Sequence, residues 1–126
     1  GPSLVIAYSH CIAHGIDMVK GMRQQKLAVD TGYWPLWRYD TRHAGPGEHP
    51  FHLDSGRAKL PLTEFTANEA RFSMLRRSRP EEAERLGALA QHDVDERRLV
   101  YELLAEIEHE PDEPDELETK EEEEEA

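Results

Sequence analysis

The run Leu4-Val5-Ile6-Ala7-Tyr8 constrains the fold of this 126-residue chain more than any other feature. It is almost continuously apolar and contains β-branched residues, as is typical of a strand buried on both faces of a parallel sheet. A parallel strand needs a crossover connection and a second strand, and no second run of this kind occurs in the sequence. The sequence therefore predicts an α/β fold that is incomplete as a domain, with the missing strands expected upstream.

The rest of the chain predicts helices and short antiparallel strands rather than more sheet. In chain order we expect a helix over 12–30, an aromatic edge strand or ribbon over 33–39, a short strand over 51–53, and helices over 66–77 and 79–108. Gly32 stands where the C-cap of the first helix is expected. The glycine- and proline-rich segment 42–50 is expected to be a loop.

Local signals place the starts of the two later helices. Thr66 with Glu69, and Ser78 with Glu81, have the spacing of a capping box, in which each side chain pairs with the other's backbone N–H. Pro80 falls within the first turn of the last helix, where its missing N–H costs nothing. We therefore expect both capping pairs to form.

The charge of the chain is concentrated at one end. The formal net charge is −12, and residues 110–126 contribute 11 acidic side chains against the single base Lys120. This low-complexity stretch is expected to be a disordered acidic tail. The near-neutral remainder disfavours a duplex nucleic-acid binder, which would present a basic face. The longest apolar run is too short to cross a bilayer, and the single cysteine excludes an internal disulfide and favours a reducing compartment.

The densest group of ligand-forming residues follows the apolar run directly. His10, Cys11 and His14 lie where open α/β sheets place their binding crevices. Three readings stay open from spacing alone: a structural thiol with two surface histidines, a zinc site using all three side chains, and a thiolate ligand to a metal cluster whose other ligands lie elsewhere.

Other candidate groups are weaker. Three histidines in the 42–50 loop and its flank are expected to be solvated, namely His43, His49 and His52. Alternating aromatics are expected in a core or subunit-interface strand, namely Trp34, Trp37 and Tyr39. The charged positions 93–98 are expected to form a solvated helix face with intrahelical pairs. We expect no self-contained catalytic or cofactor-binding site, because the sequence shows no phosphate-binding glycine loop, nucleophile elbow or carboxylate dyad.

The sequence also resembles a known family in several separate stretches. GPSLVIAYSHCIAHGID and GMRQQKLAVDTGYWPLWRYD, followed by HPFHLDSG, PLTEF, NEARFSML and RPEEAERL, are similar to the C-terminal part of pyruvate:ferredoxin (flavodoxin) oxidoreductases. The resemblance extends over about Gly1–Ala105. Thr41 departs from it, because many members have Pro at that position.

The resemblance implies a fold and an activity for the whole enzyme. Residues 1–109 would be the C-terminal part of the thiamine-diphosphate-binding domain of a long, usually homodimeric, cytoplasmic enzyme. That enzyme oxidatively decarboxylates pyruvate with thiamine diphosphate and Mg, forms acetyl-CoA from coenzyme A, and passes electrons through 4Fe–4S clusters to ferredoxin or flavodoxin. The chain alone is expected to be inactive.

The same resemblance implies one ligand residue. In the family motif Tyr-Ser-x-Cys-Ile-x-His-Gly, the Cys ligates the 4Fe–4S cluster nearest the thiamine. This sequence matches the motif, and Cys11 occupies the position of that cysteine. The other three ligands of the cluster would lie outside this chain. His10 and His14 would be supporting or packing groups near the cluster and not ligands of it. Two rival interpretations are a small independent zinc module using Cys11, His14 and His10, and an inactive structural or interaction remnant.

Overall fold

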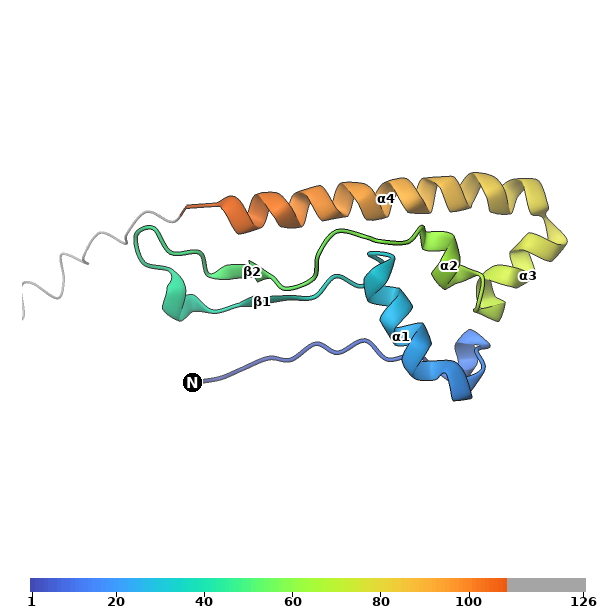
Figure 1. Cartoon of the computed structure of the whole chain (residues 1–126), viewed down its shortest axis with the longest axis horizontal. Coiled ribbons are helices and arrows are strands. Elements are labelled where there is room, and N and C mark those ends of the chain that lie inside the picture. The colour runs from blue at the N-terminus through green and yellow to red at the C-terminus, as the bar shows by residue number, and fades with distance from the viewer. Residues whose placement is uncertain (109–126) are drawn as a thin grey trace, which may run out of the picture.

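A single long helix, α4 (Pro80–Glu106), runs along one side of the molecule in the computed structural model (Figure 1). The structure describes residues 1–108, so the expected acidic tail lies outside the described residues. The other elements are α1 (Gly21–Asp30), β1 (Trp37–Tyr39), β2 (Phe51–Leu53), α2 (Leu62–Thr66) and α3 (Ala70–Ser78), with short 3₁₀ turns at Ile12–His14, Met18–Lys20 and Thr41–His43. The described chain is thus a small α/β piece. None of its helices is long and apolar enough to cross a membrane.

The expected aromatic strand pairs back on the segment after the loop. β1 and β2 form a two-stranded antiparallel sheet with Trp37 opposite Leu53 and Tyr39 opposite Phe51. The ring of Trp37 stacks on Phe51 at 5.4 Å, and both rings approach Tyr101 of α4. This aromatic cluster attaches the hairpin to α4, as the parallel course of the two elements in Figure 1 shows.

The expected strand at Leu4–Tyr8 does not form within the described residues. Leu4 and Val5 are 84% and 86% exposed, and the segment has no strand partner in the part of the chain that is described. The physical reason is the lack of a second strand beside it, which also made the sequence look incomplete as a domain. A strand is stabilised by hydrogen bonds to a neighbour, and the antiparallel hairpin lies elsewhere. The prediction of a buried strand is therefore wrong for this chain.

The helix expected over 12–30 is broken in its first half. Gly15 has φ +69°, in the left-handed region, and ends the 3₁₀ turn Ile12–His14. The carboxylate of Asp17 then accepts a hydrogen bond from the Val19 N–H at 3.1 Å and begins a second turn that leads into α1. The C-cap of α1 is Thr31, one residue before the predicted Gly32. Gly32 follows it with φ +73° and donates its N–H to the Val29 carbonyl, so the glycine does mark the end of the helix.

The later helices begin differently from the expectation. Thr66 ends α2 instead of starting a helix, and Glu69 is fully buried as the residue before α3. The Ser78 hydroxyl donates to the Met74 carbonyl at 3.0 Å rather than capping α4. Neither capping box forms. A break at 67–69 and the burial of Glu69 prevent the first, and Ser78 is the last residue of α3 while Arg79 takes the N-cap position of α4. Pro80 does occupy the first turn of α4, as predicted.

The core lies where α1 and α2 meet the underside of α4. Phe65 is fully buried, and Leu62 and Val94 are 5% and 7% exposed. Leu27 and Ala28 of α1 complete the cluster. Burial of each large apolar side chain contributes about 1.5–3 kcal/mol. These few residues therefore hold three helices together.

Candidate functional site: the Cys11 turn

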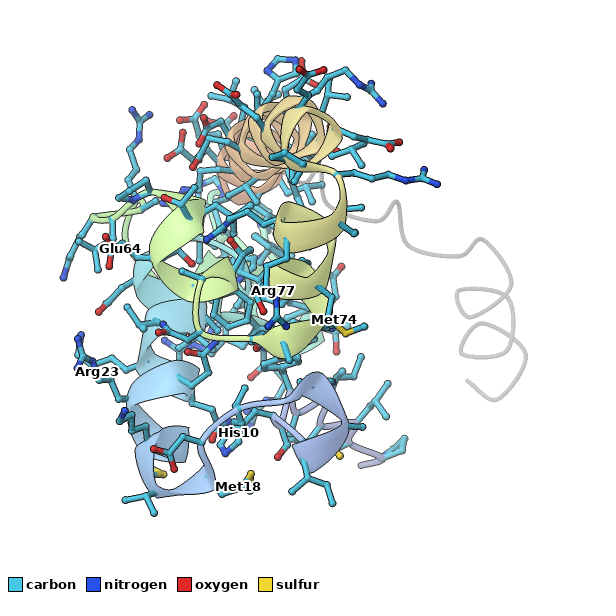
Figure 2. The ribbon with its side chains drawn as sticks, turned by 90° about the vertical axis from the view of Figure 1, so that its right-hand side faces the viewer. His10, Met18, Arg23, Glu64, Met74 and Arg77 are labelled. Atoms are coloured by element: carbon cyan, nitrogen blue, oxygen red, sulfur yellow. The ribbon has the colours of Figure 1, made fainter. Side chains whose placement is uncertain are left out.

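The Cys11 turn, residues 10–15, lies on the side of the molecule away from α4, beside the start of α1 (Figure 2). Cys11 is a free thiol and is exposed. Its backbone is extended, with φ −134° and ψ 154°, and the chain then closes into the 3₁₀ turn Ile12–His14. The His14 N–H donates to the Cys11 carbonyl at 3.0 Å. The thiol is thus carried at the rim of a tight turn and is accessible from outside.

The two histidines beside Cys11 have different surroundings. Nδ1 of His14 accepts the Cys11 N–H at 3.3 Å. The ring of His10 packs on α1, and its Nδ1 is buried without a hydrogen-bond partner among the described residues. His14 therefore stabilises the turn from within, and His10 attaches the turn to α1.

The segment before the turn is held by an aromatic stack. The Tyr8 ring stacks on Trp34 at 5.2 Å and meets Tyr33 edge-on at 5.8 Å. The amide of Gln25 in α1 donates to the Tyr8 carbonyl at 2.8 Å. Burial raises the pKa of Tyr8, with the negative charge of Glu69 adding to the shift. Tyr8 thus fixes the chain three residues before the thiol.

A buried polar network lies behind the turn, and the sequence did not reveal it. The Gln24 amide donates to the Glu69 carboxylate at 3.0 Å and to the Phe65 carbonyl at 3.0 Å. Arg71 donates to the other oxygen of Glu69, and its second donor lies 3.4 Å from the Tyr33 hydroxyl. Burial opposes the charge of Arg71, but its hydrogen bond to Glu69 and the charge of that carboxylate raise its pKa. Since a buried carboxylate needs such partners, the network joins α1 to the start of α3. Nothing in the spacing of these residues signals it.

The residues present fit a contribution of one thiolate to an iron–sulfur cluster, and not a complete site. Cys11 is the one cysteine of the sequence, whereas such clusters take four ligands, usually cysteine thiolates. Within residues 1–108, no group of three or more His, Cys, Asp or Glu side chains is arranged to hold a metal ion. A zinc site built from Cys11, His14 and His10 is therefore not assembled in the described chain.

The weaker histidine and aromatic candidates are placed elsewhere. The rings of His43 and His52 lie 6.3 Å apart, and Nδ1 of His49 lies 3.0 Å from the Ile107 carbonyl. Trp34 belongs to the Tyr8 stack and Trp37 to the cluster with Phe51. Tyr39 remains 54% exposed. Trp34 packs against the core but lies outside β1, and β1 itself is exposed, so the expectation of a core strand is wrong for these residues. The alternative of a subunit-interface strand stays a prediction.

The charged face of α4 does more than the sequence suggested. Arg97 donates to the carbonyls of Gly32 and Tyr33, and Arg98 donates to those of Ser55 and Gly56 at 2.7 and 3.1 Å. These contacts cross from α4 to two loops. The expected intrahelical pair does form at Arg98, which also donates to Glu102 at 2.9 Å, but the expectation of a solvated face with pairs inside the helix misses these contacts to the loops.

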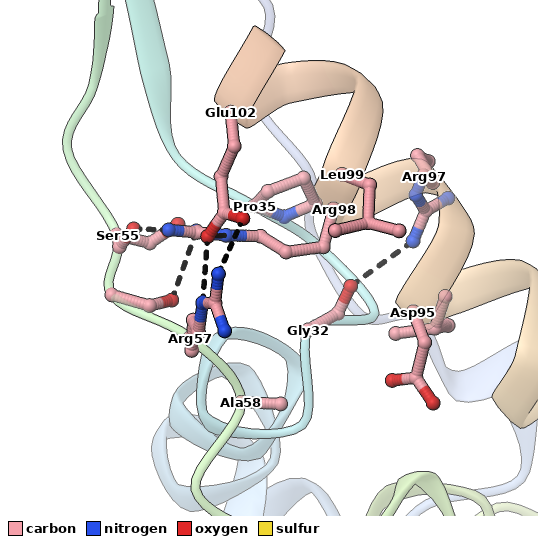
Figure 3. A pocket seen from close by; sticks show the side chains of 12 residues that line it. Gly32, Pro35, Ser55, Arg57, Ala58, Asp95, Arg97, Arg98, Leu99 and Glu102 are labelled. Carbon is pink, nitrogen blue, oxygen red and sulfur yellow. Dashed lines mark hydrogen bonds and ion pairs between the residues drawn. The ribbon is translucent and has the colours of Figure 1, made fainter. Parts of the chain in front are cut away.

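A pocket of about 310 Å³ lies between α4 and those loops (Figure 3). Glu102 accepts from Arg57 at 2.8 Å and from Arg98 at 2.9 Å. Hydrogen bonds from Arg57 and then Arg98 hold the pKa of Glu102 below its ordinary value. Because its arginines are already paired with acceptors of this chain, the pocket offers no preformed anion site.

Comparison with known proteins gives a consistent set of relatives. The chain is 50% identical over 105 residues to a pyruvate-flavodoxin oxidoreductase of Trichormus variabilis and 47% identical to one of Rhodospirillum rubrum. A protein of Synechocystis sp., provisionally given the same name, is 52% identical over 105 residues. These matches cover 83% of this chain and 9% of each relative's length. No profile of a known protein family matches the chain.

Proposed function

The chain is homologous to a segment of the pyruvate-flavodoxin oxidoreductases, and we propose that it works as part of such an enzyme. That enzyme converts pyruvate and coenzyme A to acetyl-CoA and carbon dioxide, and passes two electrons, one at a time, to flavodoxin or ferredoxin. In this proposal residues 1–109 form the C-terminal part of its thiamine-diphosphate-binding domain. The observation that carries the proposal is the level of identity, which is maintained over 83% of the chain.

The proposal assigns one chemical role to this chain. Cys11 donates its thiolate as one ligand of a 4Fe–4S cluster, and the other ligands come from parts of the enzyme outside the chain. When bound, such a cluster supplies one-electron transfer. Two observations support the role: the thiol is free and exposed, and the turn that carries it is attached to α1 and α3.

The neighbouring residues support that role without taking part in ligation. His14 holds the Cys11 N–H through its Nδ1, which stabilises the turn. His10 packs its ring on the first residue of α1. In the proposal, thiamine diphosphate, Mg, pyruvate and coenzyme A are bound by other parts of a cytoplasmic homodimer. The 126-residue chain by itself is then inactive.

The test is Cys11→Ser in the complete enzyme that carries this segment. Serine is a poorer iron ligand than a thiolate. We expect the variant to lose the signal and the iron of one cluster while its other clusters stay intact, and the reduction of flavodoxin or ferredoxin to fall steeply. The measurements are iron content, paramagnetic resonance and acceptor reduction. Full iron content with normal acceptor reduction would contradict the proposal.

A metal titration separates the rival zinc module. Zinc bound in a one-to-one ratio by the isolated chain, and lost in both Cys11→Ser and His14→Ala, would favour the independent module. We expect no such binding, because no three-ligand group is assembled in residues 1–108.

A further inference from the structure

We propose that Gly15, Ala70 and Gly21 are positioning residues for the thiol of Cys11. This inference rests on the function proposed above. They fix the Cys11 turn on both sides of the thiol by close contact with the first residues of two helices. Ala70 begins α3 and Gly21 begins α1. Neither glycine is assigned a role by the resemblance or by the relatives.

The first contact follows the thiol in the chain. The Ala70 N–H donates to the Gly15 carbonyl at 3.1 Å. A Cβ on Gly15 would lie 2.3 Å from the Ala70 Cβ and 3.3 Å from the Ala70 backbone nitrogen. Gly15 also has φ +69°, which side chains rarely adopt. Both conformation and space therefore require glycine, and the turn rests directly on α3.

The second contact precedes the thiol. A Cβ on Gly21 would lie 2.3 Å from Nε2 and 2.9 Å from Cε1 of His10. The backbone of Gly21 is ordinary right-handed helix, with φ −52° and ψ −45°. Conformation does not require glycine here, and alanine would favour the helix. A methyl group at this position would therefore displace the His10 ring, and the glycine is what lets the ring lie on the first residue of α1.

The two supporting helices are themselves joined behind the turn. Gln24 of α1 reaches Glu69 and the Phe65 carbonyl, and Glu69 directly precedes Ala70. The thiol thus lies on a short bridge between two elements whose relative position is fixed by a buried network. Residues that orient a metal ligand from behind typically change metal affinity by 10- to 100-fold when mutated.

The experiment compares glycine variants in the complete enzyme. Gly15→Ala makes the positive φ at this position unfavourable and also brings a Cβ into close contact with Ala70. Its control is Gly47→Ala, which has the same kind of strain, at φ +75°, but nothing within 4 Å of the added Cβ. Gly47 lies in the loop between β1 and β2. Figure 1 shows that this loop is at the end of the molecule away from the start of α1.

We expect Gly15→Ala to alter the paramagnetic resonance signal of one cluster and to lower its affinity for iron, measured by competition with a chelator, by about 10- to 100-fold. Gly47→Ala should match the wild type in both measurements. The double variant Gly15→Ala/Ala70→Gly removes the nearest clashing atom and should recover part of the signal. Rescue would show that the contact with Ala70, and not the strained φ alone, causes the change in the cluster signal.

A second pair of variants keeps the test decisive if Gly15→Ala does not fold. Gly21→Ala and Gly87→Ala each add a methyl group to a helix, and the Cβ on Gly87 would meet nothing within 4 Å. Both substitutions favour helix formation. We expect only Gly21→Ala, which displaces the His10 ring, to change the signal of the same cluster.

The outcomes distinguish this inference from the function on which it rests. If Cys11→Ser keeps its full iron, the proposed function fails and the inference fails with it. If Cys11→Ser loses one cluster while Gly15→Ala and Gly21→Ala behave like their controls, the proposed function stands and only the positioning role is overturned. Loss of one cluster in Cys11→Ser, together with an altered signal of the same cluster in Gly15→Ala and Gly21→Ala, supports both.

Discussion

The N-terminal segment (residues 1–20) and the body of the chain (residues 21–106) treat their apolar side chains differently. In the body, Phe65, Leu62 and Val94 are buried among residues of the same chain. In the N-terminal segment, Leu4, Val5 and Val19 are almost fully exposed. Both sets are equally capable of favourable burial at about 25 cal/mol per Å². Burial therefore follows the presence of a partner and not the hydrophobicity of the residue.

The way the two regions are attached differs as well. The body is joined by a shared core, by the hairpin and by arginines that cross from α4 to the loops. The N-terminal segment touches the body at separate points, through Tyr8, His10 and Gly15. A change in the body should thus affect folding, whereas a change in the segment should affect association or the position of Cys11.

The largest expected effect is on the core of the body. Phe65→Ala removes a fully buried ring, and such truncations cost about 3–5 kcal/mol. We expect urea unfolding of the 126-residue chain to show a loss of this size, or no folded baseline at all. Ile6→Ala, at a residue 66% exposed, is the matched change in the N-terminal segment. Equal losses from the two substitutions would remove the distinction between the regions.

The buried network behind the Cys11 turn should give the next largest effect. Glu69→Ala leaves the donors of Gln24 and Arg71 without their acceptor, which costs about 1.5–3 kcal/mol for hydrogen bonds to a charged group. Thermal unfolding measures the change. Glu64→Ala, at an exposed position of α2, is the control and should have little effect. If Glu69→Ala left the thermal stability unchanged, the network would not be what joins the helices.

Val5→Lys should separate association from stability. Because Val5 is exposed, the substitution should change the free energy of unfolding of the chain by less than about 0.5 kcal/mol. Self-association, measured by sedimentation, should fall because an exposed apolar side chain is replaced by a charge. Val94→Lys, the same substitution at a buried position, should unfold the chain. Marked destabilisation by Val5→Lys would mean that the segment packs on the body after all.

The smallest expected effect is a pH dependence within the body. The pKa of Glu102 is lowered from its ordinary 4.5, first by the hydrogen bond from Arg57. A lowered folded-state pKa contributes stability that is present above the unfolded pKa and is lost as the pH falls through the folded value. Glu102→Gln should therefore flatten the acid limb of the stability profile below about pH 4.5. Glu106→Gln is the control, and an unchanged acid limb in Glu102→Gln would show that the arginine pairs add no stability.

Local chemistry was sufficient to predict several features of this chain. Gly32 follows the end of α1, Pro80 lies in the first turn of α4, and the aromatic strand pairs with Phe51–Leu53. Cys11 was selected from sequence as the only thiol and as part of a family motif, and its role as a cluster ligand stays a prediction. Each of these depends on backbone conformation or on residue type at neighbouring positions, which the sequence contains directly.

The tertiary structure alone decided which side chains are buried and which segments meet. Glu69 had the spacing of a capping residue, yet it is buried between Gln24 and Arg71. Arg97 had the position of a solvated charge, yet it donates to loop carbonyls 64 and 65 residues away. The contacts of Gly15 with Ala70 and of Gly21 with His10 are of the same kind. Partners that are distant in sequence leave no local pattern, because their proximity arises only when the helices pack.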